Sequence, residues 1–307
     1  MHTRSFYVSE SGKSALTPHP PLCYKRDNER TLISREPSAD IKSSKGFSTM
    51  IRKIHYVWLG SPEPEAVKQN IAQWAKLNPD YEICAWHDGD IDVSGSNFGE
   101  LALQQKRWGY VPDIVRLKAI YEHGGLYVDC DMEPVDALSK LEPYGDKMII
   151  GYMYDCALGT ACWYAPPKHP YVADLLRRYQ RIKYNTWPVS NSIYTEYFIN
   201  SVPGFLLTGQ AWENDLCKVY PKEFFEQPTF IRRRGISVHH YCGTWKPGAS
   251  FDNFSTGRRS IASHLLLWLK RKINTHRALL RNEFRPYYEA AKRGESLPYP
   301  QDVYYEG

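Results

Sequence analysis

Two aspartates, Asp129 and Asp131, stand two residues apart directly after a short apolar segment, residues 126–128. Side chains at i and i+2 of an extended segment point the same way, so both carboxylates can face one ion. Mg²⁺ and Mn²⁺ prefer oxygen ligands, and they usually bind through one or two carboxylates together with substrate phosphates. The pair therefore predicts a divalent-metal site that neutralises a phosphate-bearing ligand. The alternative for so short a motif is a solvated turn.

The residues before this pair predict the elements that position it. Residues 112–123 predict a helix, with proline in its first turn and an apolar face at helical spacing. Gly124 and Gly125 end that helix, and residues 126–128 predict a strand that delivers Asp129 to its end. Ligands bind beyond the carboxyl ends of strands in open α/β sheets. We therefore expect a binding site at this edge of the sheet.

Strand and helix signals alternate along the rest of the chain. Strands are predicted at residues 53–58, 81–86, 126–128, 147–153 and 161–164, and helices at residues 61–77, 98–107, 112–123 and 171–184. Such alternation predicts an α/β fold with a mostly parallel central sheet.

The segment from Asp113 to Asp131 reads DIVRLKAIYEHGGLYVDCD. It closely resembles the D-I-x-R-x-x-x-L-x-x-x-G-G-x-Y-x-D-x-D block of the glycosyltransferases with a sugar-binding DXD region. That family includes the yeast initiating α-1,6-mannosyltransferase and bacterial capsule and lipopolysaccharide enzymes, and the clostridial glucosylating toxins share a related block. Similar segments flank it, so the resemblance spans about residues 51–248: residues 54–60 (IHYVWLG), 219–225 (VYPKEFF) and 238–245 (VHHYCGTW).

The resemblance implies a GT-A-like, Rossmann-like nucleotide-diphospho-sugar transferase fold. It also implies a metal-dependent enzyme that moves a hexose from a UDP- or GDP-linked sugar to a glycan or glycolipid acceptor. The family generally retains the anomeric configuration, and it suggests a role in capsular polysaccharide or lipopolysaccharide synthesis. On this basis residues 50–250 form the catalytic domain. Residues 1–49 are expected to be a disordered leader, and residues 251–307 a basic, amphipathic, helical C-terminal extension.

The same resemblance assigns roles to five early residues. Trp58 would stack on the nucleotide base, unless it is simply a core tryptophan. Asp113 and Arg116 lie three residues apart on one helix face and would contact ribose or donor-sugar hydroxyls. The alternative for this pair is a surface ion pair, which contributes little. Asp129 and Asp131 would contact the ribose and the metal, Mn²⁺ or Mg²⁺.

Four residues late in the chain would close the site. His239 or His240 would complete the metal shell, since histidine is a common metal ligand, and the pattern does not decide between them. Thr244, where the family has serine, would offer its hydroxyl to metal or phosphate beside Trp245. The alternative is a histidine at a strand end next to a packed tryptophan. No carboxylate is singled out as nucleophile or base.

Residues 258–293 carry ten Lys or Arg against two Glu, a net charge of +8 that exceeds the +5 of the whole chain. Residues 260–288 also show helical periodicity with a tryptophan among the apolar positions. Basic amphipathic helices of this kind suit an anionic membrane surface. The alternative is a helix packed on the catalytic domain with its basic face in water. No nucleic-acid partner is expected, because no recognised motif accompanies the charge.

The sequence contains seven cysteines without a C-x-x-C pair, no apolar run long enough to span a bilayer, and no signal peptide. We therefore expect a cytoplasmic protein, peripheral at the inner face of the membrane. One rival enzyme class is the haloacid-dehalogenase-like phosphatases, but Glu133 stands where their motif requires Thr or Val. A rival of another class is a degenerate, non-catalytic protein that binds a nucleotide sugar or acts as a scaffold at the membrane surface.

Overall fold

The computed structural model describes residues 22–24, 49–229, 235–243 and 260–306. The strands are β1 Leu22–Tyr24, β2 Lys53–Val57, β3 Glu82–Trp86, β4 Gly125–Val128, β5 Met132–Pro134, β6 Met148–Tyr154, β7 Ala157–Ala165, β8 Trp212–Glu213, β9 Cys217–Tyr220 and β10 Ser237–His239. The helices are α1 Glu65–Leu77, α2 Asn97–Gln104, α3 Val111–His123, α4 Pro170–Gln180, α5 Ser190–Ser201, α6 Ile261–Arg281 and α7 Arg285–Lys292, with short 3₁₀ turns at Leu138–Tyr144 and Gln301–Val303.

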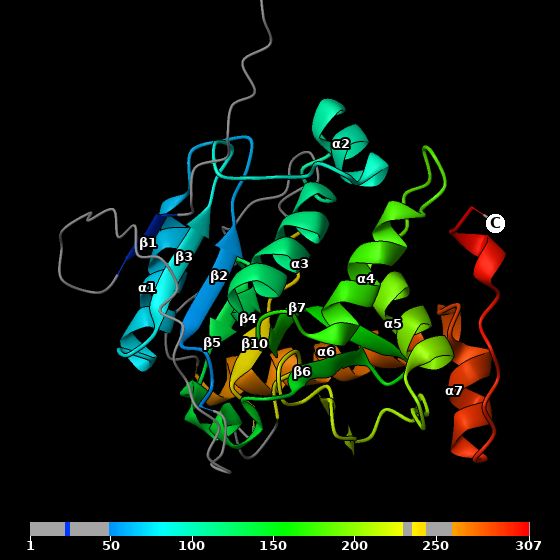
Figure 1. Cartoon of the computed structure of the whole chain (residues 1–307). Coiled ribbons are helices and arrows are strands. Elements are labelled where there is room, and N and C mark those ends of the chain that lie inside the picture. Colours follow the sequence, from blue (N-terminus) through cyan, green and yellow to red (C-terminus); the bar gives the residue numbers. More distant parts are fainter. Residues whose placement is uncertain (1–21, 25–48, 230–234, 244–259, 307) are drawn as a thin grey trace, which may run out of the picture.

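Within these ranges, one mixed sheet has the strand order β1-β3-β2-β4-β7-β6-β9-β8, and β5 pairs separately with β10. Strands β2, β3, β4, β6 and β9 run in one direction, whereas β1, β7 and β8 run in the other. The predicted α/β fold with a mostly parallel central sheet is therefore confirmed (Figure 1).

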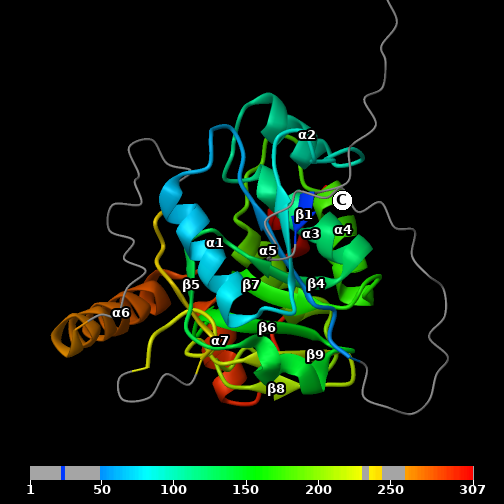
Figure 2. The ribbon, with the colours of Figure 1, turned by 90° about the vertical axis from the view of Figure 1, so that its left-hand side faces the viewer.

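Both faces of the sheet are covered. Helices α2 to α5 pack on one face, where the larger apolar cluster lies, and α1 with the first 3₁₀ turn packs on the other (Figures 1 and 2). Strand β4 divides its side chains accordingly, because alternate residues of a strand point to opposite faces. Tyr127 joins the larger cluster, and Leu126 and Val128 join the smaller one. All of β4 is buried. This packing fixes the position of Asp129, the residue that directly follows the strand.

Two glycines at the start of β4, Gly124 just before it and Gly125 as its first residue, are required because neighbouring segments of the chain approach closely. Gly124 has a φ of 63°, and a Cβ there would lie 2.8 Å from the Pro167 nitrogen. Gly125 has a φ of 114°, and its Cβ would lie 2.7 Å from the Lys53 carbonyl oxygen. The turn is also held by His55, whose Nε2 donates to the Gly124 carbonyl at 2.9 Å. Burial lowers the pKa of His55 to about 3, so this imidazole stays neutral.

The chain ends contain two departures from the sequence predictions. The expected continuous helical segment over residues 260–288 is two helices, because Pro286 lies in the first turn of α7 and cannot continue a helix from α6. The segment expected to be a disordered leader contributes edge strand β1, antiparallel to β3. Phe284 and Tyr299 belong to the larger apolar cluster, so the C-terminal segment shares the main core. Among the described helices, none has the length and apolar character of a membrane span.

Candidate active site

A cavity of about 560 Å³ opens where β2 and β4 end, the edge at which the sequence predicted a site. This volume is typical of small-molecule pockets. Trp58, directly after β2, lies in its wall together with Asp113 and Arg116 of α3. The segment after β4 contributes Asp129 and Asp131. Five residues predicted from separate parts of the sequence thus meet in one pocket.

Asp129, Asp131 and His239 each offer one ligand atom, and these atoms lie within 4.8 Å of one another. The two aspartates stand on a turn between β4 and β5 rather than on an extended segment. Cys130 between them directs its thiol away, toward the Val57 carbonyl oxygen at 3.4 Å. Carboxylates suit Mg²⁺ and Mn²⁺, and imidazole is a common additional ligand. The residues present therefore fit the predicted divalent metal.

The structure distinguishes the two late histidines. The His239 ring lies among the ligand atoms, with Nε2 at 3.3 Å from Asp131 Oδ1. The His240 ring points elsewhere and lies 2.8 Å from Glu133 Oε2 through its Nε2. Successive residues at the end of β10 project to opposite sides, so only one of them can face the Asp pair. Of the two histidines between which the sequence did not decide, His239 is therefore the one placed beside the Asp pair, and His240 is not.

His239 is held between two carboxylates, with its Nδ1 donating to Glu226 Oε2 at 2.6 Å. Burial disfavours its charged form, but Asp131 and Glu226 outweigh burial and raise the pKa of His239 well above its ordinary value. Burial likewise opposes ionisation of Asp131, yet the charge of His239, its hydrogen bond and the backbone N–H of Cys242 lower the pKa of Asp131 to about 2. A divalent cation bound here must displace the His239 proton.

Arg116 connects α3 to the Asp pair. Its Nη2 donates to Asp113 Oδ1 at 2.8 Å, and its Nη1 donates to the Thr160 carbonyl at 2.8 Å and lies 3.6 Å from Asp129 Oδ1. The side chains of Asp113 and Arg116 are only 3% and 6% exposed, so the alternative of a surface ion pair is wrong. Burial raises the pKa of Asp113 to about 6, although the Arg116 charge opposes that shift. Tyr127 Oη donates to Asp129 Oδ1 at 2.8 Å and orients the first carboxylate.

The wall of the pocket also carries two tryptophans. Trp58 is half-buried against the smaller apolar cluster, and its Nε1 donates to the Ser61 carbonyl at 2.9 Å. Trp108 lies in the same wall and packs over Gly60, where a Cβ would come within 2.5 Å of the indole ring. Gly60 also has a φ of 79°. A glycine is therefore needed for this pocket mouth to keep its shape.

Sequence reasoning missed Glu226 and Tyr241, which support His239. Tyr241 Oη donates to Glu226 Oε2 at 3.0 Å, and its ring lies 3.9 Å from the His239 ring. Nothing in the spacing of Glu226 pointed to a site, because it lies far along the chain from the Asp pair, whereas Tyr241 lies within the resembled segment 238–245. Tyr127 was within the resembled block and could have been found there. Thr244 and Trp245, predicted to close the site, lie outside the described residues.

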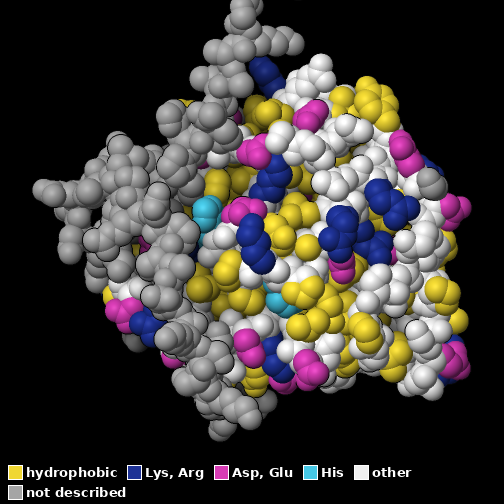
Figure 3. Space-filling view, viewed as in Figure 1, with side chains coloured by type: hydrophobic (Ala, Val, Ile, Leu, Met, Phe, Trp, Pro, Cys, Tyr) yellow, Lys and Arg dark blue, Asp and Glu magenta, His cyan; other side chains and the backbone are white. Residues whose placement is uncertain are grey.

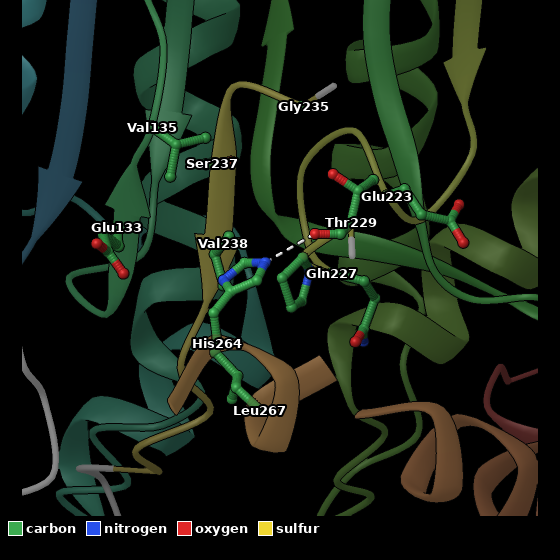
Figure 4. A pocket seen from close by; sticks show the side chains of 11 residues that line it. Glu133, Val135, Glu223, Gln227, Thr229, Gly235, Ser237, Val238, His264 and Leu267 are labelled. Carbon is green, nitrogen blue, oxygen red and sulfur yellow. Dashed lines mark hydrogen bonds between the residues drawn. The ribbon is translucent and has the colours of Figure 1, made fainter. Parts of the chain in front are cut away.

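A second, much smaller cavity of about 20 Å³ lies between β5, β10 and α6. It is large enough for about one water molecule, so it is no substrate site. Figure 4 shows His264 of α6 directed at Thr229, to whose carbonyl oxygen its Nε2 donates at 2.8 Å. This cavity therefore marks where α6 attaches to the body.

The match to a family model agrees with the resemblance found in the sequence. Residues 64–150 match the model of the glycosyltransferase sugar-binding region containing a DXD motif. The "Subversion of eukaryotic traffic protein A" of Legionella pneumophila subsp. pneumophila (strain Philadelphia 1) is 29% identical over 108 residues, covering 26% of this chain. The chain spans 17% of the length of that relative. The PaToxG glycosyltransferase structure has a TM-score of 0.44 and 18% identity, over 51% of this chain and 70% of that one.

The matched region begins just before α1 and ends within β6, so it contains both α3 and the Asp pair. Within the match to the glycosyltransferase sugar-binding region, Asp129-Cys130-Asp131 supplies the DXD motif. The predicted family resemblance is confirmed at this level.

Proposed function

We propose that this chain is a metal-dependent glycosyltransferase that moves a hexose from a UDP- or GDP-linked sugar to a glycan or glycolipid acceptor. The observation that carries the proposal is that one pocket brings together three candidate metal ligands and two tryptophans, namely Asp129, Asp131, His239, Trp58 and Trp108. A nucleotide sugar has matching parts, because its diphosphate needs a cation and its base offers a ring for stacking.

Each group of residues has a separate task in this proposal. Asp129, Asp131 and His239 hold the metal, which acts as a Lewis acid on the departing nucleoside diphosphate. Arg116 and Asp113 present a buried donor and acceptor to ribose or sugar hydroxyls, and buried charged hydrogen bonds give such contacts their specificity. Trp58 stacks on the base.

The finer parts of the proposal concern setting and stereochemistry. Retention of the anomeric configuration, Mn²⁺ or Mg²⁺ as the metal, and a role in capsular polysaccharide or lipopolysaccharide synthesis all follow from the family resemblance. A cytoplasmic protein working peripherally at the inner membrane face would meet a lipid-linked glycan acceptor there. One relative is named for subverting eukaryotic traffic. Protein acceptors should therefore be tested beside glycan and glycolipid acceptors.

The test is hydrolysis of a panel of UDP- and GDP-sugars in the presence of Mn²⁺, comparing the wild type with Asp131→Asn. Asp136→Asn is the matched control, since Asp136 lies just after β5 with a side chain 43% exposed and pairs with Lys140. We expect one donor class to be turned over, with the activity lost in Asp131→Asn, retained in Asp136→Asn and abolished by EDTA. Donor binding without turnover in the wild type would instead support the non-catalytic scaffold.

A further inference from the structure

Helix α6 uses one face to attach to the body of the protein. Besides His264, this face carries Arg271, whose Nη2 donates to the His239 carbonyl at 2.7 Å and whose guanidinium lies 4.3 Å from the centre of the Tyr241 ring. Thr275, one further turn along, is buried. His264, Arg271 and Thr275 are spaced by seven and four residues, so they lie on one face of the helix. The attached face of α6 therefore packs directly behind the metal-ligating histidine.

The opposite face of α6 is apolar and exposed. Leu266, Leu269, Ile273 and Leu280 are 67%, 43%, 53% and 48% exposed. At 3.6 residues per turn they fall within a strip about 60° wide, roughly opposite Arg271. We call these four residues the outer stripe. A continuous apolar strip of this kind on an otherwise polar surface marks an interaction site rather than scattered exposure.

The charges around the outer stripe have a single sign. Lys270, Lys272, Arg277 and Arg281 are exposed, and the 21 residues of α6 include no Asp or Glu. By helical geometry Lys270, Arg277 and Arg281 flank the stripe within about 60° of Leu266. On the face shown in Figure 3, by contrast, Lys and Arg lie among Asp and Glu. The helix also extends away from the body (Figure 2), which leaves the outer stripe accessible.

We propose that the outer stripe docks on an anionic lipid surface, with its leucine and isoleucine side chains in the interface and the flanking Lys and Arg at acidic headgroups. An apolar strip bordered by basic side chains is the signature of a helix that lies in the membrane plane. Long basic side chains place their stems along the apolar boundary and their charges in the headgroup layer. A nucleic acid would engage the charges but leave the apolar strip unexplained.

Docking on lipid also has a consequence for the acceptor, and this consequence rests on the proposed glycosyltransferase function. The outer stripe and Arg271 lie on opposite faces of one helix, and a helix with side chains is about 10–12 Å across. Docking would therefore hold the His239 segment about one helix diameter above the lipid headgroups. An acceptor carried on a membrane lipid is then the class that the site can reach without leaving the surface.

The test is co-sedimentation of the full chain with vesicles of phosphatidylcholine alone and of phosphatidylcholine mixed with phosphatidylglycerol. The stripe variant is Leu269→Ser/Ile273→Ser, and its matched control is Leu297→Ser/Val303→Ser, since Leu297 and Val303 are each 43% exposed outside α6.

The charge variant is Lys270→Gln/Arg277→Gln/Arg281→Gln. Its control removes the same charge elsewhere, from the exposed Lys68, Lys76 and Lys106. Light scattering reports the oligomeric state of each protein, and donor hydrolysis without vesicles is measured in parallel.

We expect the wild type to bind the mixed vesicles in a salt-dependent way and to bind neutral vesicles weakly. The stripe and charge variants should each lose at least about tenfold in vesicle partitioning, whereas the controls should stay near wild type and donor hydrolysis should be unchanged. Equal binding to both vesicle types, unaltered binding by the stripe variant, or a wild-type dimer that this variant dissociates would overturn the proposal. Vesicle binding without donor hydrolysis would leave docking intact and reject the glycosyltransferase function.

Discussion

Substituting Glu226 by Gln tests whether the metal site depends on the residue behind His239. Glu226 is 1% exposed, and its Oε2 accepts from both His239 Nδ1 at 2.6 Å and Tyr241 Oη at 3.0 Å. With Nδ1 occupied in this way, Nε2 is the nitrogen directed at Asp131. Glutamine keeps the shape of the side chain but removes its charge. It can also present its NH₂ to His239, which favours the wrong imidazole tautomer.

The expected magnitude follows from the type of interaction. A hydrogen bond to a charged group contributes about 1.5–3 kcal/mol, which corresponds to roughly ten- to a hundredfold in a binding constant. Loss of a carboxylate behind a metal-bound histidine has an effect of the same order on metal affinity. We therefore expect Mn²⁺ affinity to fall by about ten- to a hundredfold in Glu226→Gln.

The assay is direct titration of Mn²⁺ by electron paramagnetic resonance, without donor, followed by donor hydrolysis at increasing Mn²⁺. The activity of Glu226→Gln should recover substantially when Mn²⁺ is saturating, because the ligands themselves are intact. Glu223→Gln is the matched control, since Glu223 lies three residues away with a side chain 42% exposed. An unchanged Mn²⁺ affinity in Glu226→Gln, with the fold intact by circular dichroism, would refute the reasoning.

Two further changes should affect the same pocket. Gly159→Ala would place a Cβ 2.5 Å from Glu226 Oε1, so the buried carboxylate must shift; the Mn²⁺ titration should show weaker binding, whereas Gly89→Ala, with nothing within 4 Å, should not. Asp113 has a pKa raised by burial to about 6, so it is ionised above that pH and protonated below it. If Asp113 accepts a hydrogen bond from the donor sugar, kcat/KM should fall as the pH drops through about 6. Asp113→Asn should have a low kcat/KM that no longer changes with pH in this range. Initial rates measured from pH 5 to 8 test both expectations.

The sequence predicted best what depends on neighbouring residues. Helix α3, the glycine turn and β4 follow one another within a short segment, and each has a local physical cause: proline in the first turn, two positive φ angles, and a strand buried on both faces. Trp58 could be placed because β2 ends immediately before it. The Asp pair was located correctly, although it forms a turn instead of an extended segment.

The features that the sequence could not predict are those that tertiary contacts determine. His239 and His240 are equivalent as a dipeptide, and only the pairing of β10 with β5 decides which ring faces Asp131. Glu226 could not be recognised, because its role depends on where the fold places His239, thirteen residues later in the sequence. Likewise, helical periodicity gave α6 its apolar positions but did not assign them to an attached and an exposed face.

The two faces of α6 connect the donor site to the surface of the protein. The candidate metal ligands come from two distant segments, the turn after β4 and the end of β10, and β10 is only three residues long. Arg271 supports it from α6 through the His239 carbonyl and the Tyr241 ring. If the outer stripe docks as proposed, binding would stabilise the same helix that backs His239. On that proposal, docking of the outer stripe and ligand binding at the pocket would be coupled through α6, and by reciprocity each would favour the other.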